Sequence, residues 1–165
     1  MSFPQRRSDR AMASHPINLD DVASACRAAG YVIAEIDGGL EVSGADDGGA
    51  FYLLPQGDWL QVRCQVLDTG DLDQARDLTA LFETVARVQF RLIGCRFGFD
   101  VHSGLWLVED LYPGFEADGV PAVLEQLAFV WGSLQDLLDA ALKGATPNDD
   151  TLDAAFELVS VGPPN

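Results

Sequence analysis

The chain has 165 residues, of which 48% are hydrophobic, so it is long and apolar enough to form one domain with a buried core. Its 26 acidic and 10 basic residues give a formal net charge of −16, which argues against nucleic-acid binding because phosphates are bound by basic surfaces. The sequence has no apolar run long enough to span a bilayer and no signal-peptide core at its N-terminus, so we expect a cytoplasmic protein without a membrane span.

The N-terminal segment has no hydrophobic periodicity and contains the arginines Arg6, Arg7 and Arg10, so we expect a flexible basic tail over residues 1–17. A predicted helix follows, from Leu19 to about Ala29. Asn18 is a suitable N-cap for this helix, and Gly30 marks its end. The apolar stripe of the helix is formed by Leu19, Val22, Ala23 and Cys26.

Several short apolar segments come next, separated by turn residues. Tyr31–Ile36 has the pattern of a strand, Asp37–Gly39 is a tight reversal, and Leu40–Ser43 is a short arm of that strand. Phe51–Leu54 and Trp59–Leu67 are the next two predicted strands. Apolar residues alternate with polar ones along the longer of them, which is typical of an antiparallel strand with one covered and one wetter face.

The second predicted helix begins at Thr69 or Asp71 and continues to about Val88, because apolar residues recur three and four positions apart. These residues are Leu72, Ala75, Leu78, Leu81, Phe82, Val85 and Val88. Alternation of apolar and polar residues then returns in Leu92–Val101 and Leu105–Leu111, which are separated by a short turn. This pattern predicts a β-hairpin.

The third helix is predicted from Pro121, a favourable first-turn residue, to the stop signal Gly144. Its apolar residues wrap around much of the circumference, so the helix is either buried on more than one side or in contact with a partner. The main domain therefore spans residues 18–143. Residues 144–165 form a C-terminal extension, in which 151–160 can fold as one short amphipathic helix.

The resulting order of elements is α-β-β-β-α-β-β-α. Because the strands follow one another as hairpins, we expect an α+β fold with an antiparallel five-stranded sheet packed by helices. Helices on one face of this sheet would leave Trp106 and Val108 on the other face. Apolar side chains exposed among acidic ones are typical of binding sites, so we predict partner binding at Trp59, Trp106 and Val108.

The residues that could carry chemistry favour structural roles. Cys26, Cys64 and Cys95 occupy apolar positions of predicted elements, which indicates buried free thiols rather than metal ligands. A metal site would need more ligands at suitable spacing, and His15 and His102 are the chain's two histidines. We therefore expect neither a metal nor another cofactor.

The turn between the last two strands contains Asp100, His102 and Ser103, which are the residue types of a hydrolase triad. Triad residues must converge from separate elements so that base and nucleophile can meet, and neighbours in one tight turn cannot do so. We therefore expect no enzymatic activity. The abundance of Asp and Glu keeps one alternative open, which is a carboxylate-based enzyme built from dispersed acids.

The order of elements, the length and the low pI resemble those of the class I type III secretion chaperones and related chaperone-like bacterial domains, the YbjN-like and YjfI-like proteins among them. The similar stretch runs from Asn18 to Leu142, and Asp100–Leu107 is similar to the family's turn between its last two strands. This resemblance implies a homodimer that binds a partner polypeptide through apolar grooves and added strands, without chemistry. Carried over to this chain, the family's dimer interface corresponds to Leu81, Phe82, Val85, Val88, Phe97 and Phe99.

Together, these patterns predict a non-enzymatic, acidic, dimeric protein-binding module whose partner is an effector-like or regulatory polypeptide. One alternative is a stand-alone regulatory or stress-related bacterial domain of the same kind. Another is a regulatory domain whose N-terminal arginines contact an acidic surface, such as a membrane or the domain itself.

Overall fold

The computed structural model describes residues 16–44 and 49–161. Most of the predicted basic tail therefore lies outside the described residues. The described chain has an α+β fold with one antiparallel sheet of six strands. The strands are β1 (Val32–Ile36), β2 (Gly39–Ser43), β3 (Ala50–Gln56), β4 (Trp59–Leu67), β5 (Arg96–Asp100) and β6 (Gly104–Leu111). Their order across the sheet is β1-β2-β3-β4-β6-β5, so β1 and β5 are the edge strands.

The predicted count of five strands is one too low, because the short arm is a complete strand, β2. It pairs along its length with both β1 and β3. Gly38 has a φ of 79°, which allows the two-residue reversal that places Gly39 opposite Ile36. Gly39 also lies so close to the carbonyl oxygen of Leu53 that a Cβ there would be 2.3 Å from it. The absence of a side chain at Gly39 therefore lets β3 pair with this turn of the chain.

The helices are α1 (Leu19–Ala28), α2 (Thr69–Asp73), α3 (Leu78–Gln89), α4 (Val120–Leu142) and α5 (Asp149–Val161), with a short 3₁₀ helix at Ala117–Gly119. The single long helix expected after β4 is thus two helices. Asp77 separates them, because its side chain accepts hydrogen bonds from the backbone N–H groups of Thr79 and Ala80 and so acts as the N-cap of α3. The continuous apolar spacing across this region concealed the cap.

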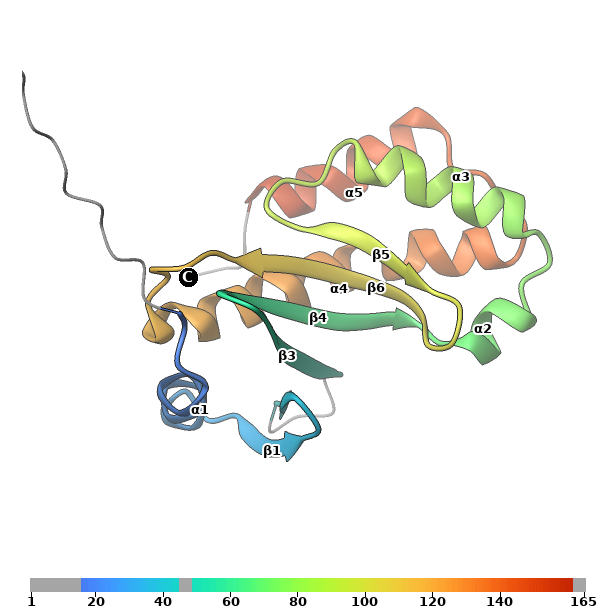
Figure 1. Ribbon diagram of the computed structural model, residues 1–165. Helices are drawn as coiled ribbons and strands as arrows, with labels where there is room; N and C mark the ends of the chain where they lie inside the picture. Colours follow the sequence, from blue (N-terminus) through green and yellow to red (C-terminus); the bar gives the residue numbers. More distant parts are fainter. Residues whose placement is uncertain (1–15, 45–48, 162–165) are drawn as a thin grey trace, which may run out of the picture.

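The long apolar helix α4 is covered within one subunit. Figure 1 shows it running behind the strands, and it packs against α1, α3, α5 and β4. Its buried residues are Val120, Val123, Leu124, Leu127, Val130, Leu134, Leu137, Leu138 and Ala141. Together with the inward side chains of β2, β3, β4 and β6 they form the hydrophobic core. Of the two interpretations that the sequence left open for this helix, burial on more than one side therefore holds, and α4 itself requires no partner.

The C-terminal helix α5 belongs to the same core. Leu152 is only 1% exposed and packs in the main hydrophobic cluster. Arg87 of α3 and Arg91, just after α3, form ion pairs of 2.6 Å with Asp149 and Asp153 of α5. The helix expected after Gly144 therefore forms and shares its packing with the domain over residues 18–143.

Within the described residues, no helix has both the length and the apolarity that crossing a bilayer requires.

Candidate protein-binding surfaces

In the part of the chain that the structure describes, one face of the sheet carries no helix, and we call it the open face (Figure 1). It is formed by alternate side chains of the strands, among them Gln61, Arg63 and Gln65 of β4 and Trp106, Val108 and Asp110 of β6. The opposite face of the same two strands is buried and mostly aliphatic. The alternation predicted for both strands is therefore confirmed, and it places polar and aromatic groups on the open face.

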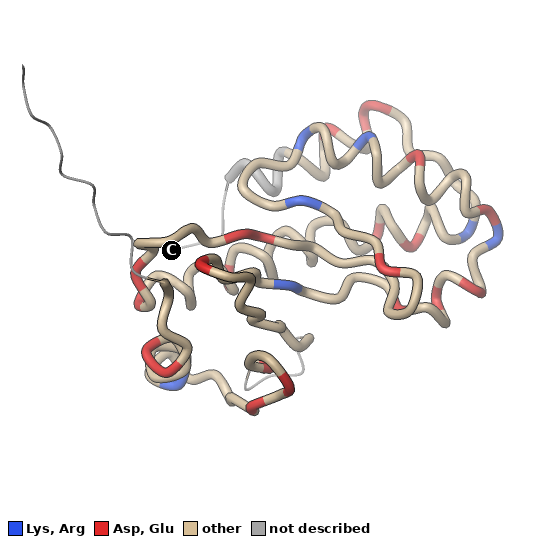
Figure 2. Tube along the Cα trace, viewed as in Figure 1, with Lys and Arg blue, Asp and Glu red and all other residues tan. Residues whose placement is uncertain are grey.

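A chain of hydrogen bonds crosses three strands on the open face. Arg63 Nε donates to Gln61 Oε1 at 2.6 Å, and Gln61 Nε2 donates to Asp110 Oδ1 at 2.7 Å. The other oxygen of Asp110 accepts from Arg96 Nη1 at 2.6 Å. Figure 2 shows basic positions on β4 and β5 in a chain whose charged residues are mostly acidic. The network holds two guanidinium groups in fixed positions on either side of β6.

Between these two arginines lies a small hollow of about 170 Å³, bordered by Arg63, Arg96, Phe99 and Trp106. The strand register places Val108 directly between Arg63 and Arg96, and Gly98 beside Trp106. Val108 is only 5% exposed, because the long arginine side chains flank it. Together with Gly98 it forms the apolar base of the hollow.

Two aromatic pairs lie on the open face on either side of the hydrogen-bonded chain. Trp106 packs edge-on against Tyr52 with ring centroids 5.5 Å apart, and its Nε1 donates to the hydroxyl of Ser103. Trp59 packs against Tyr112 at 5.1 Å, and these two side chains are 45% and 62% exposed. The predicted partner-binding residues Trp59, Trp106 and Val108 thus share one face. Val108, however, is covered by its neighbours within the subunit, so the prediction that a partner covers it is wrong. Tyr112 was missed, although it continues the alternation of β6 beyond the strand end.

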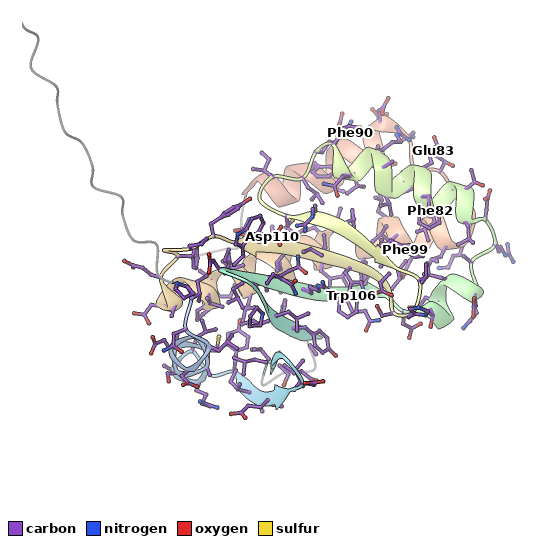
Figure 3. All side chains as sticks on the ribbon, viewed as in Figure 1. Phe82, Glu83, Phe90, Phe99, Trp106 and Asp110 are labelled. Carbon is purple, nitrogen blue, oxygen red and sulfur yellow. The ribbon has the colours of Figure 1, made fainter. Side chains whose placement is uncertain are left out.

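A second candidate surface lies where α3 meets the edge strand β5. Phe82 and Phe99 pack edge-to-face with ring centroids 5.6 Å apart, yet they are 41% and 52% exposed (Figure 3). Leu78, one turn before Phe82, and Val101, just after β5, are also exposed. We call these four residues the α3–β5 patch. Phe90 and Ile93 extend the exposed apolar surface at the other end of α3.

The six residues predicted for a dimer interface have three different environments. Phe82 and Phe99 belong to the α3–β5 patch. Val85 and Phe97 are half-buried and pack against the core, whereas Leu81 and Val88 are fully buried and have no surface to offer a partner. The residues not foreseen are Leu78, Phe90, Ile93 and Val101. The apolar residues Leu78, Phe82, Ala86 and Phe90 recur every four positions, and this spacing was the signal for the outer side of α3.

The outer edge of β5 is partly closed to another strand. The backbone N–H of Phe97 donates to Oε1 of Gln89 at the end of α3, at 2.6 Å. A side chain thus takes the position that an added strand would need, which is one way in which proteins protect a sheet edge. We therefore expect a partner to contact side chains at the β5 edge. Addition of a strand is expected at the other edge, along β1.

Asp100, His102 and Ser103, the residues of the triad type, form hydrogen bonds within and next to the β5–β6 turn. The backbone N–H of His102 donates to Asp100 Oδ1 at 2.7 Å, and this hydrogen bond lowers the pKa of the Asp100 carboxyl. Ser103 accepts the hydrogen bond from Trp106.

Across residues 16–44 and 49–161, no three His, Cys, Asp or Glu side chains gather closely enough to hold a metal ion. All three cysteines are free and buried, and burial raises the pKa of Cys64 and Cys95 to about 11.

Glu109 is the polar group of the inner face that is least well satisfied. It lies opposite Val62 on the covered side of the sheet, and its Oε2 is buried and has no hydrogen-bond partner among the described residues. Burial, followed by the nearby charge of Asp110, raises the pKa of this carboxyl. The folded protein therefore binds this proton more tightly than the unfolded chain does, so this group lowers stability progressively as pH rises through the folded pKa.

We expect Glu109→Gln to stabilise the protein at pH 7 by about 1 kcal/mol, the lower end of the cost of an unsatisfied buried polar group. This gain corresponds to a rise in Tm of about 2–4 °C for a domain of this size. Thermal unfolding of both proteins between pH 4 and pH 8 would test it. The difference should shrink towards acidic pH, where the wild-type carboxyl is protonated, and an equal difference at every pH would contradict the assignment.

The chain matches no protein-family model, and a comparison with curated proteins finds no significant relative.

Proposed function

We propose that this chain is a non-enzymatic protein-binding module that forms a homodimer through the α3–β5 patch and binds a partner polypeptide on the open face. The observation that carries the proposal is the exposed pair of Phe82 and Phe99. A rigid aromatic pair at an edge of the subunit is a strong anchor for an interface, because aromatic residues carry much of the binding energy in known complexes.

The energetics favour burial of the α3–β5 patch. Complete burial of one Phe or Leu side chain contributes about 1.5–3 kcal/mol, and monomeric proteins rarely expose contiguous apolar surface without a use for it. A second copy is the simplest occupant, because a two-fold axis brings identical patches together. In such a dimer, the ring of Phe82 in one subunit would pack against the same patch of the other subunit.

Several of the chain's acids have structural roles. Asp68 and Asp77 are N-caps of α2 and α3, and both side chains accept backbone hydrogen bonds. Asp149 and Asp153 form ion pairs at the surface of α5. These four carboxylates thus have structural roles. A carboxylate-based enzyme would need acids that converge on one cavity, and the acids that share a hollow are Asp21, Glu116 and Asp118, between α1 and the 3₁₀ helix.

The fold supports a use like that of the class I type III secretion chaperones, which bind polypeptides as dimers. The order expected from the resemblance is present, with β2 and α5 added and the second helix divided. The three reduced, buried thiols are consistent with work in a reducing compartment such as the cytoplasm. Within this proposal, the partner would lie across the aromatic and polar residues of the open face.

The test is the mass of the full-length chain in solution, measured by light scattering behind a sizing column at micromolar concentration. We expect the mass of a dimer, twice 17.8 kDa. The ratio of dimer to monomer should fall on dilution, because the patch is small for an obligate interface. A strict monomer throughout the micromolar range would contradict the dimer.

A further inference from the structure

We infer that the hollow on the open face binds a carboxylate side chain of the partner polypeptide, with Arg63 as its main ligand and Trp106 as the platform for the neighbouring apolar side chain. This inference rests on the proposed function and names the chemistry that the open face recognises.

Among the described residues, Arg63 is the half-buried basic residue that forms no ion pair. Arg87, Arg91 and Arg96 form ion pairs with aspartates. Arg63 is half-buried, but among the described residues its only side-chain hydrogen bond is the one from Nε to Gln61. Its Nη1 and Nη2 groups thus keep four N–H donors without a described partner. A guanidinium that is partly desolvated and still has free donors is suited to a carboxylate, which can accept two parallel hydrogen bonds from it.

The position of the guanidinium is fixed before any ligand arrives. Gln61 bridges Arg63 and Asp110, and Asp110 in turn holds Arg96. The amide of Gln61 is thereby oriented so that its oxygen faces Arg63. A ligand therefore need not order a long flexible side chain, which is a large part of the cost of forming an exposed ion pair.

The shape of the hollow sets the size of its occupant. A volume of about 170 Å³ is below the range of pockets for cofactors and drug-like ligands, which starts at about 300 Å³, and it suits one side chain. Gly98 keeps the space open: a Cβ there would lie 3.2 Å from Cγ2 of Val108. The aliphatic part of a Glu side chain could rest on Val108, with its carboxylate at Arg63.

Two acidic residues lie at the hollow: Asp110 is paired with Arg96, whereas Asp100 lines the hollow and keeps its negative charge. Both oxygens of Asp110 accept hydrogen bonds, from Gln61 and Arg96, and Asp100 Oδ1 accepts from the backbone of His102. The net charge of −16 opposes an acidic ligand at long range. This repulsion is screened beyond about 8 Å at physiological ionic strength, so local contacts decide the binding. Nucleic-acid phosphates would bring many charges against the same acidic surface and are disfavoured.

Two synthetic peptides provide the test, acetyl-Leu-Glu-Leu-amide and acetyl-Leu-Gln-Leu-amide, titrated into the full chain labelled with ¹⁵N. Amide spectra would follow the indole Nε1–H of Trp106 and the Nε–H of Arg63. We expect the Glu peptide to bind about 10-fold more tightly than the Gln peptide, the difference that a charge-assisted hydrogen bond supplies. Arg63→Gln should abolish this preference, and Arg63→Lys should keep part of it.

Arg27→Gln is the matched control, because Arg27 is an exposed arginine on α1, away from the open face. It should leave the 10-fold preference unchanged. Equal binding of the two peptides to the wild-type open face would contradict the carboxylate site. It would still agree with the proposal that the open face binds a polypeptide. If neither peptide shifts any signal of the open face, both fail. If Arg63→Gln instead converts the dimer into a monomer, the carboxylate belongs to a second copy of the chain. The inference of a separate partner is then wrong.

Discussion

Phe82→Asp is expected to convert the proposed homodimer into a folded monomer. The substitution places a charge in the centre of the α3–β5 patch, and an unpaired charge buried in an interface costs at least about 3 kcal/mol. In the isolated subunit the same side chain is 41% exposed, so the aspartate can remain hydrated and the fold should survive. Light scattering would report the loss of the dimer mass, and circular dichroism with thermal unfolding would report the retained fold.

Val32→Asp is the control for this experiment. Val32 is also an exposed apolar residue, 61% exposed, but it lies on β1 at the opposite edge of the sheet. Its substitution should leave the dimer intact. Phe99 is not used in the test because it borders the hollow of the open face as well. A dimer that persists in Phe82→Asp would show that α3 does not carry the interface.

Phe99 links the two proposed activities. Its ring packs on Phe82 in the α3–β5 patch, and the residue also borders the hollow between Arg63 and Arg96. A dimer that covers the patch would therefore lie next to the site for the partner's carboxylate. Dimerisation can thus limit the motion of β5 and favour partner binding, without any direct contact between the second copy and the partner.

The sequence predicted best those elements whose pattern is local. Trp59–Leu67 has the predicted bounds because strict alternation over nine residues permits few other structures. The α4 helix begins at Val120, one residue before the predicted proline. By contrast, β2 is only five residues long and contains a glycine, and its status depends on pairing with β3, a distant contact that no local pattern reveals.

The exposure of the site residues was harder to predict than their secondary structure. Leu81 and Phe82 are adjacent apolar residues on α3, yet one is fully buried and the other forms the centre of the patch. The choice depends on how α3 is rotated against α4 and β5, which is decided by packing between elements distant in sequence. The open face was easier to predict, because the alternation in β6 separates Trp106 from Leu105 and Leu107.

The interpretation of α4 failed in part for the same reason. Its apolar residues outnumber those that one buried face needs, so the sequence allows a partner as one of two explanations. The sequence alone places α5 in an extension beyond the main domain and does not reveal its contact with α4. In the structure, α5 itself covers α4, and residues such as Leu137 and Leu138 are buried beneath neighbouring helices. The proposal that the chain binds partners therefore rests on the α3–β5 patch and the open face rather than on the composition of α4.

Leu152→Ala should lower the free energy of unfolding by about 2–5 kcal/mol, because it removes a fully buried side chain from the contact of α5 with the core. For a domain of this size the expected fall in Tm is roughly 5–15 °C. Asp153→Asn on the next position of the same helix is the matched control, since it removes only the surface ion pair with Arg91 and should cost less than about 1 kcal/mol. Thermal and urea unfolding would measure both variants. Equal, small effects would show that α5 is a peripheral segment whose loss the domain tolerates, whereas a large effect of Leu152→Ala alone would establish that the domain needs this helix to cover α4.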